Sequence, residues 1–214
     1  VSQRVCEFLG VNPEGKKIIT CHIGNGGSIT AVKDGKSIDT SMGLTPLEGL
    51  MMGTRSGDID AGAVTFIMEK ENLTAAGVSD LLNKKSGVKG IFGVSSDMRE
   101  LEAAVAAGNN KMADLTENMY FYRIKKYIGA YAAALGGVDI IVFTGGVGEN
   151  QASCRSGACE GLEYMGVKLD LEKNKVRGEE AVISADDSKV KVVVIPTDEE
   201  LMIASDTMAI LNKK

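Results

Sequence analysis

Hydrophobic and polar residues alternate along the first part of the chain. The alternation over residues 16–23, 28–33 and 36–41 predicts three consecutive β-strands. Asp34-Gly35 separates the second strand from the third, and this pair favours a two-residue hairpin because both positions tolerate positive φ. The three strands are therefore expected to form an antiparallel meander.

Apolar residues in the rest of the chain recur every three or four positions, which predicts α-helices. Asp58 or Asp60 is the expected cap of the first of these, and Ser96 or Asp97 of the third. The predicted helices cover residues 58–70, 75–84, 96–107, 110–135, 151–165 and 198–211, and residues 1–9 read as a further helix ended by Gly10.

The longest predicted helix, residues 110–135, carries two apolar stripes and stops at Gly136-Gly137. We expect both stripes to pack in the core, because this spacing is typical of the buried face of a helix. The stripes are Met112, Leu115, Met119 and Tyr122, and Ile124, Ile128, Tyr131 and Leu135.

Two further runs, residues 139–143 and 190–195, are apolar throughout, as in strands covered on both faces. Each leads through a loop into a predicted helix. A meander followed by such strand–helix units predicts an α/β fold, and we expect one domain because no Pro/Ser-rich linker interrupts the 214 residues.

Composition narrows the classes of function. The formal net charge of −5 argues against a nucleic-acid-binding surface. No apolar run approaches the roughly 20 residues that a membrane crossing needs. The four cysteines form no Cys-x2-Cys pair, which favours reduced thiols in a cytoplasmic protein over a zinc site.

The loop after the first strand, with the sequence CHIGNGGS over residues 21–28, offers glycine amides at its tip. Such amides can donate hydrogen bonds to a phosphate without steric hindrance. Asn-Gly is also a strong signal for a plain hairpin turn, and taken alone the loop favours that turn.

Three later segments favour phosphate binding over a plain hairpin turn: GTRSGD at residues 53–58, FTGGVGEN at 143–150 and PTDEE at 196–200. Each lies at the carboxyl end of a predicted strand or the start of a predicted helix, where ligands bind in α/β folds. The G-x-G-x-x-G spacing fails because position 151 is Gln, and the Gly-Lys-Ser/Thr of P-loops is absent.

The segments HIGNGGS, DTSMGLTPLEGLMMGTRSGDID, SSDMR, FTGGVGEN and PTDEEL, in this order, resemble the acetate kinase family. The resemblance runs over nearly the whole chain but only over the family's C-terminal half. It implies that residues 1–214 are the C-terminal nucleotide-binding domain of a two-domain kinase, with residues 1–10 as the tail of a preceding helix. It also implies a ribonuclease-H-like module of the actin and hexokinase superfamily.

The resemblance further implies an activity: ATP and acetate give ADP and acetyl phosphate, reversibly, with Mg²⁺ and in a homodimer. Propionate or butyrate kinase is the alternative within this reaction class, and a non-catalytic nucleotide-binding module is the alternative outside it. The family's other half supplies a second active-site arginine and most of the acetate pocket, so we expect little turnover from this chain alone.

Arg55 is the candidate catalytic residue. A guanidinium presents a planar fork of donors that can neutralise a moving phosphoryl group, and the resemblance implies this role. From the residues alone, a surface arginine paired with Asp58 or Asp60 is equally reasonable.

Pro46 is either part of the wall around the acetate methyl group, as the resemblance implies, or a plain turn residue.

The resemblance places the remaining site residues in four segments. Met98 is expected to pack on the base, and Asp97 fits a helix cap as well. Glu199 is the implied Mg²⁺ ligand, although adjacent Glu200 and a helix-dipole role are alternatives. The implied nucleotide-binding residues are His22, Ile23, Gly24, Asn25 and Gly26 at the phosphates, Asp97, Met98 and Arg99 along the site, and Gly146, Val147, Gly148, Glu149 and Asn150 at the adenosine.

Overall fold

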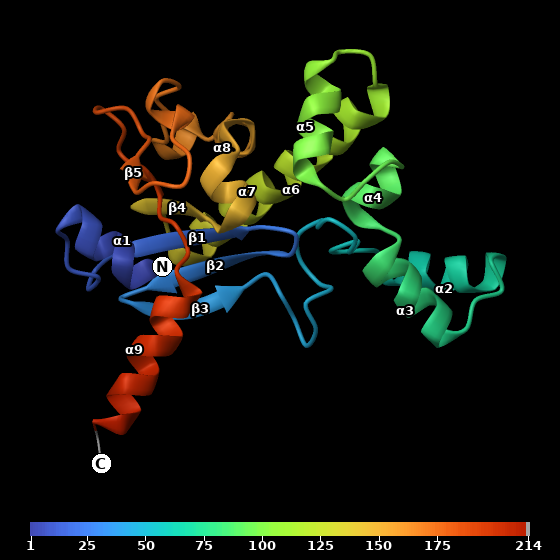
Figure 1. Ribbon diagram of the computed structural model, residues 1–214, viewed down its shortest axis with the longest axis horizontal. Helices are drawn as coiled ribbons and strands as arrows, with labels where there is room; N and C mark the ends of the chain where they lie inside the picture. Colours follow the sequence, from blue (N-terminus) through green and yellow to red (C-terminus); the bar gives the residue numbers. More distant parts are fainter. Residues whose placement is uncertain (213–214) are drawn as a thin grey trace.

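A computed structural model of the protein describes residues 1–212, which build a mixed six-stranded sheet with helices on both faces (Figure 1). The strand order is β3-β2-β1-β4-β6-β5. β1, β2 and β3 pair antiparallel, whereas β4 and β6 continue the sheet parallel to β1. The strands are β1 Lys17–Ile23, β2 Gly27–Lys33, β3 Lys36–Thr40, β4 Ile140–Thr144, β5 Ala181–Val182 and β6 Lys191–Val194.

This arrangement confirms the predicted α/β fold, an antiparallel meander extended by parallel strand–helix units. The turn between β2 and β3 has the expected backbone, with φ of 52° at Asp34 and 74° at Gly35. Both values are positive, as the two-residue hairpin requires.

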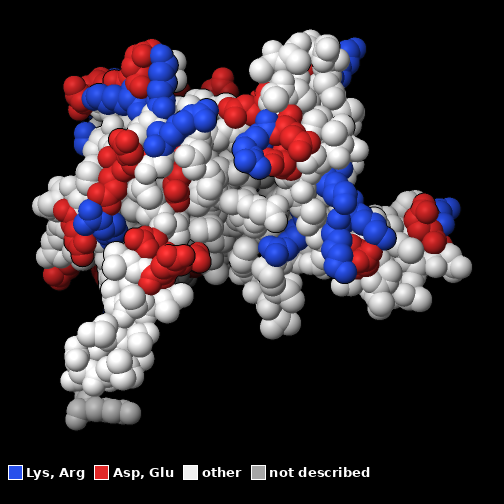
Figure 2. Space-filling view, viewed as in Figure 1, with Lys and Arg blue, Asp and Glu red and all other residues white. Residues whose placement is uncertain are grey.

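The helices differ in how closely they pack on the sheet. In Figure 1, α2 and α3 lie together at one end of the molecule, and α9 projects away from the sheet. Figure 2 shows mostly uncharged surface along α9 beyond its acidic first turn. The helices are α1 Ser2–Leu9, α2 Ala61–Lys70, α3 Ala75–Lys84, α4 Gly87–Phe92, α5 Met98–Ala106, α6 Lys111–Leu135, α7 Gly145–Asn150, α8 Ala152–Cys159 and α9 Glu199–Leu211.

Neighbouring residues of the central strands enter two different cores because strand side chains alternate between faces. Ile19 and Ile141 point to the larger core under α6, while Ile18 and Ile140 point to a smaller core that includes Val5 of α1. All five residues of β4 are buried. No helix within residues 1–212 has the length and apolar composition that a bilayer crossing would require.

The predicted burial of both stripes on α6 is half wrong. Ile124, Ile128, Tyr131 and Leu135 are buried, but Met112, Leu115, Met119 and Tyr122 are between 39% and 59% exposed. At about 100° per residue the two stripes lie on opposite sides of the helix, and only one side can face the sheet.

Two local predictions also need correction, and two short elements were not predicted. The helix expected over residues 151–165 ends at Cys159, and Gly161 then has a positive φ of 79°. The glycine-rich segment Gly145–Asn150 is a short helix, α7, rather than a turn. Neither α4 nor β5 was predicted, since six and two residues are too short to show a period.

Of the alternative caps, Asp60 and Asp97 are the ones used. The Asp60 carboxylate accepts from Gly62 N at 2.7 Å, and the Asp97 carboxylate accepts from Arg99 N at 2.8 Å. Asp58 has another role, described below.

The contact between α6 and α8 gives a direct test of the packing. A methyl group on Gly157 of α8 would overlap the Phe121 ring. Gly157→Ala is therefore expected to lower the free energy of unfolding by roughly 1–3 kcal/mol, as other overpacked cores do. Urea unfolding measures this value.

Gly129 of α6 provides the matched control, because its nearest neighbour, Tyr164 Oη, would be 3.9 Å from an added methyl group. Gly129→Ala should be neutral or stabilising by up to about 1 kcal/mol, since alanine favours helix. Equal effects at the two positions would contradict the described packing.

Candidate nucleotide-binding site

Parallel pairing of β1 and β4 brings two glycine-rich turns to the same edge of the sheet. His22 lies opposite Thr144 in the register, so both strands end together. Gly145 has a φ of 78°, and a Cβ there would be 2.8 Å from Ile23 O. A Cβ on Gly24 would be 4.0 Å from Gly146 N. Only glycine permits this approach at position 145, whereas a side chain at position 24 would make ordinary van der Waals contact with Gly146.

The loop that carries Arg55 closes on the tip of the same hairpin. Gly53 N donates to Asn25 O at 3.1 Å, and a Cβ on Gly53 would overlap Asn25 Oδ1. Arg55 Nη1 would be 3.2 Å from a Cβ on Gly26, and it donates to Pro46 O at 3.3 Å. The structure thus brings Asn25, Arg55 and Pro46 together.

The alternative in which Arg55 pairs with Asp58 or Asp60 is wrong. Asp58 instead accepts from Arg123 Nη2 at 2.6 Å, Tyr127 Oη at 2.8 Å and Gly49 N at 2.8 Å. Within residues 1–212, Arg55 forms no ion pair with a carboxylate. Asp58 therefore anchors the loop to α6 and leaves the guanidinium of Arg55 at the hairpin tip.

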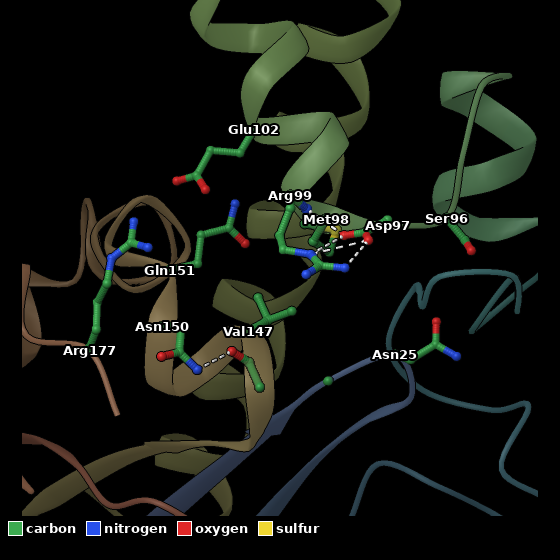
Figure 3. Close-up of a pocket in the computed structure, with 12 residues that line it drawn as sticks. Asn25, Ser96, Asp97, Met98, Arg99, Glu102, Val147, Asn150, Gln151 and Arg177 are labelled. Atoms are coloured by element: carbon green, nitrogen blue, oxygen red, sulfur yellow. Dashed lines mark hydrogen bonds and ion pairs between the residues drawn. The ribbon is translucent and has the colours of Figure 1, made fainter. Parts of the chain in front are cut away.

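A cavity of about 660 Å³ opens beside this tip, between α5 and the α7–α8 segment (Figure 3). Eight of the residues expected at the nucleotide line it: Gly24, Asn25, Asp97, Met98, Arg99, Gly146, Val147 and Asn150. Sequence reasoning missed four further lining residues: Ser96, Glu102, Gln151 and Arg177. Of these, Ser96 belongs to the SSDMR motif, and Gln151 directly follows FTGGVGEN.

At the wall of the cavity, Asp97 and Arg99 interact with each other. The Arg99 guanidinium lies 2.6 Å from the Asp97 carboxylate. This hydrogen bond, together with that from Arg99 N, lowers the pKa of Asp97 to about 2. Asp97 is thus both helix cap and cavity wall, while Met98 beside it is buried, at 7% exposure.

Other predicted residues lie at the sheet edge but do not line the cavity. Ile23 is fully buried, so its backbone alone faces the loop, and His22 is partly exposed. Glu149 Oε1 accepts from Gly145 N at 2.8 Å and from Thr197 N at 2.9 Å. The Glu149 carboxylate therefore ties the glycine segment to the chain entering α9.

Arg155 holds the cavity wall from behind and was not anticipated from the sequence. Its guanidinium is fully buried, and burial lowers its pKa. It donates to the carbonyls of Gly148 and Glu149 at 2.9 Å and of Val176 at 2.8 Å, and to Oδ1 and the carbonyl of Asn174. These bonds connect the glycine segment to residues 174–176, next to Arg177 at the cavity.

The residues present can supply one carboxylate ligand to Mg²⁺, but they do not form a complete Mg²⁺ site. Within the described part of the chain, no three His, Cys, Asp or Glu side chains group closely enough to hold a metal. Glu199 and Glu200 are exposed in the first turn of α9, and Asp198 caps that helix through Leu201 N at 2.9 Å. Mg²⁺ beside a nucleotide commonly takes one or two carboxylates and completes its shell with phosphates and water.

Glycine turns grouped at the carboxyl edge of a mixed sheet, with an arginine beside them, are typical of α/β proteins that bind phosphate-containing ligands. The family model described as the acetokinase family matches residues 1–205. The chain belongs to this family.

Individual relatives support this family assignment. The chain is 87% identical over 213 residues to a protein of Phocaeicola vulgatus named acetate kinase, covering 100% of this chain and 53% of the relative. The crystal structure of Porphyromonas gingivalis acetate kinase matches with a TM-score of 0.95 and 61% identity, over 98% of this chain and 53% of that one. A propionate kinase from Francisella tularensis matches with a TM-score of 0.86 and 41% identity, over 95% and 51%. The chain thus spans about half the length of the relatives it matches.

The buried Arg155 allows a test of how the cavity wall is held. Arg155→Met removes the donor for five hydrogen bonds and leaves buried carbonyls without a partner. We expect a loss of about 3 kcal/mol or more in the free energy of unfolding, measured by urea denaturation.

The control is Arg4→Met, at an arginine that is exposed and paired with Glu180 on the surface. This variant should shift the urea midpoint only slightly, since exposed ion pairs contribute little. A small loss in the Arg155 variant as well would show that the guanidinium does not hold the wall.

Proposed function

We propose that this chain is the C-terminal, nucleotide-binding half of an acetate kinase. The whole enzyme transfers the terminal phosphoryl group of ATP to acetate, giving ADP and acetyl phosphate, and catalyses the reverse reaction. The observation that carries the proposal is the position of Arg55, held against the hairpin tip at Gly26 and free of any carboxylate within residues 1–212. The relatives' names support the choice of reaction.

In the proposed reaction an acetate oxygen attacks the terminal phosphorus of ATP while the bond from that phosphorus to the ADP oxygen breaks. Such transfers need alignment of the two oxygens and neutralisation of charge on the phosphoryl group. The Arg55 guanidinium supplies the charge, and the backbone amides of Asn25 and Gly26 hold the phosphates, since Gly24 N donates within the loop to Gly26 O at 2.8 Å. Mg²⁺, with Glu199 as its protein carboxylate, neutralises further charge on the phosphates when bound.

The adenosine occupies the cavity between α5 and the glycine segment. Met98 and Val147 supply its apolar contacts, and the glycines of residues 145–148 let the ribose approach the backbone. His22 orients the phosphate loop. Ile23 and Gly148 act through their backbone, and Glu149 holds the glycine segment in place through its carboxylate. Asp97, Arg99 and Asn150 complete the polar wall.

The Pro46 carbonyl accepts from the Arg55 guanidinium at 3.3 Å, so Pro46 adjoins the proposed catalytic group. This position supports a role of its ring beside the acetate methyl group. Propionate remains the alternative substrate because a propionate kinase is among the similar structures. Rates of the full-length enzyme with acetate, propionate and butyrate distinguish these cases.

The missing half of the enzyme has a surface to pack against. The large apolar side chains of α9 are 56–67% exposed, although burial of such side chains drives folding. We propose that the other domain covers α9, that the chain alone is inactive, and that acetyl phosphate assays on it would show this. The exposed side chains are Leu201, Met202, Ile203, Met208, Ile210 and Leu211.

The exposed stripe on α6 supports a homodimer, because contiguous apolar surface of this kind marks protein–protein contacts. A cytoplasmic location fits the four buried, unpaired cysteines. Analytical ultracentrifugation of the full-length enzyme tests the dimer.

The catalytic role of Arg55 is tested in the full-length enzyme by Arg55→Ala. We expect the turnover number to fall roughly 100-fold or more, because a positioned charge is lost where negative charge develops. The KM for ATP should change much less. Acetyl phosphate trapped with hydroxylamine gives the rate.

Arg4→Ala is the matched control, since Arg4 lies on α1 and pairs with Glu180 on the surface. It should leave turnover unchanged. Normal turnover of the Arg55 variant would refute its catalytic role and favour the non-catalytic nucleotide-binding module.

A further inference from the structure

The side-chain amide of Gln151 is buried without a hydrogen-bond partner. The residue is 5% exposed, and neither Nε2 nor Oε1 has a partner among residues 1–212. The only other side-chain atom in this condition in the described chain is Ser184 Oγ. Buried polar groups are nearly always paired because leaving one unpaired destabilises the fold. An amide with both groups unused therefore points to a ligand.

The local structure does not use this side chain either. Gln151 occupies the N-cap of α8, where a polar side chain usually accepts from the first turn of the helix. Its backbone is extended, with φ of −109° and ψ of 99°, and its side chain makes no capping bond. In Figure 3 the side chain instead extends from the start of α8 toward α5, where Met98 and Glu102 lie.

Three polar neighbours of Gln151 in the cavity are already engaged. Asn150 Nδ2 donates to Gly146 O at 2.9 Å, and Arg99 is paired with Asp97. Glu102 accepts from Ser153 Oγ at 3.2 Å. Gln151 is thus a lining side chain that holds both an unused donor and an unused acceptor.

We propose that Gln151 is a specificity-determining residue that binds the adenine base of ATP. Its Oε1 accepts from the 6-amino group and its Nε2 donates to N7, the paired arrangement that a glutamine amide forms with adenine. At the same edge guanine offers two acceptors, so it takes only one of these bonds. Because the amide lies just behind the cavity wall, a rotation of its side chain brings it to the base. This inference rests on the proposed function.

The test is Gln151→Met in the full-length enzyme, since methionine keeps the length of the side chain and removes both polar groups. Without nucleotide, the thermal midpoint should rise by about 1–3 °C, because an unpaired polar group is removed. The KM for ATP should rise about tenfold, the factor for a loss of one net hydrogen bond. The KM for GTP should rise less than that for ATP, because guanine takes only one of the two bonds.

Ser184→Ala is the matched control. It removes the other unpaired buried atom, which does not line the cavity. It should also raise the thermal midpoint, but leave both KM values unchanged. A rise in stability combined with weaker ATP binding is thus expected at position 151 alone.

A ligand lacking the 6-amino group, purine riboside triphosphate, tests the same contact without a substitution. The wild type should bind it about tenfold less tightly than ATP, and the Gln151 variant should bind both alike. The inference is overturned if the variant is less stable than wild type, if its KM for ATP is unchanged, or if the wild type does not distinguish the two ligands. A failure of the proposed function can be told apart from a failure of this inference. In that case the wild type would form no acetyl phosphate, but calorimetric binding of ATP and its analogue would still test Gln151.

Discussion

The register between β1 and β4 is the constraint on which the candidate site depends. With His22 opposite Thr144, both strands end at the same level and turn within a few ångströms of each other. Gly145 turns there with a positive φ, against the carbonyl of Ile23. A shift of one residue in this register would reverse the faces of β4 and separate the two turns. The close approach of the two turns requires glycine at position 145. Arg55 lies at this edge because its loop is hydrogen-bonded to the tip of the β1–β2 hairpin.

Charged side chains divide into those that hold the scaffold and those that remain for a ligand. Asp58 fixes the Arg55 loop to α6, Glu149 fixes the glycine segment to Thr197, and Arg155 fixes it to residues 174–176. Such supports keep a site within the narrow geometry that phosphoryl transfer needs. Within residues 1–212, Arg55 is left without a carboxylate partner, and neighbouring Asp58 is engaged by Arg123.

The sequence predicted what depends on local pattern. Alternation located the meander, Asp34-Gly35 located its turn, and the glycine motifs located loops that the structure brings together. It did not show which stripe of α6 would be covered, since that depends on where the sheet lies. Nor did it find Arg155 or Gln151, because each is significant only through neighbours distant in the sequence or through a partner it lacks. Roles of individual site residues came from resemblance and remain proposals.

We propose that the loops at residues 24–26, 53–55 and 145–148 form one site, with Arg55 directed at the transferred phosphoryl group. A crystal structure of the full-length enzyme with ADP, aluminium fluoride and acetate tests this most directly. We expect the fluoride group between ADP and acetate, with the Arg55 guanidinium about 3 Å from it and the adenosine in the cavity lined by Met98 and Val147. A nucleotide bound elsewhere, or an Arg55 side chain directed away from the fluoride, would contradict it.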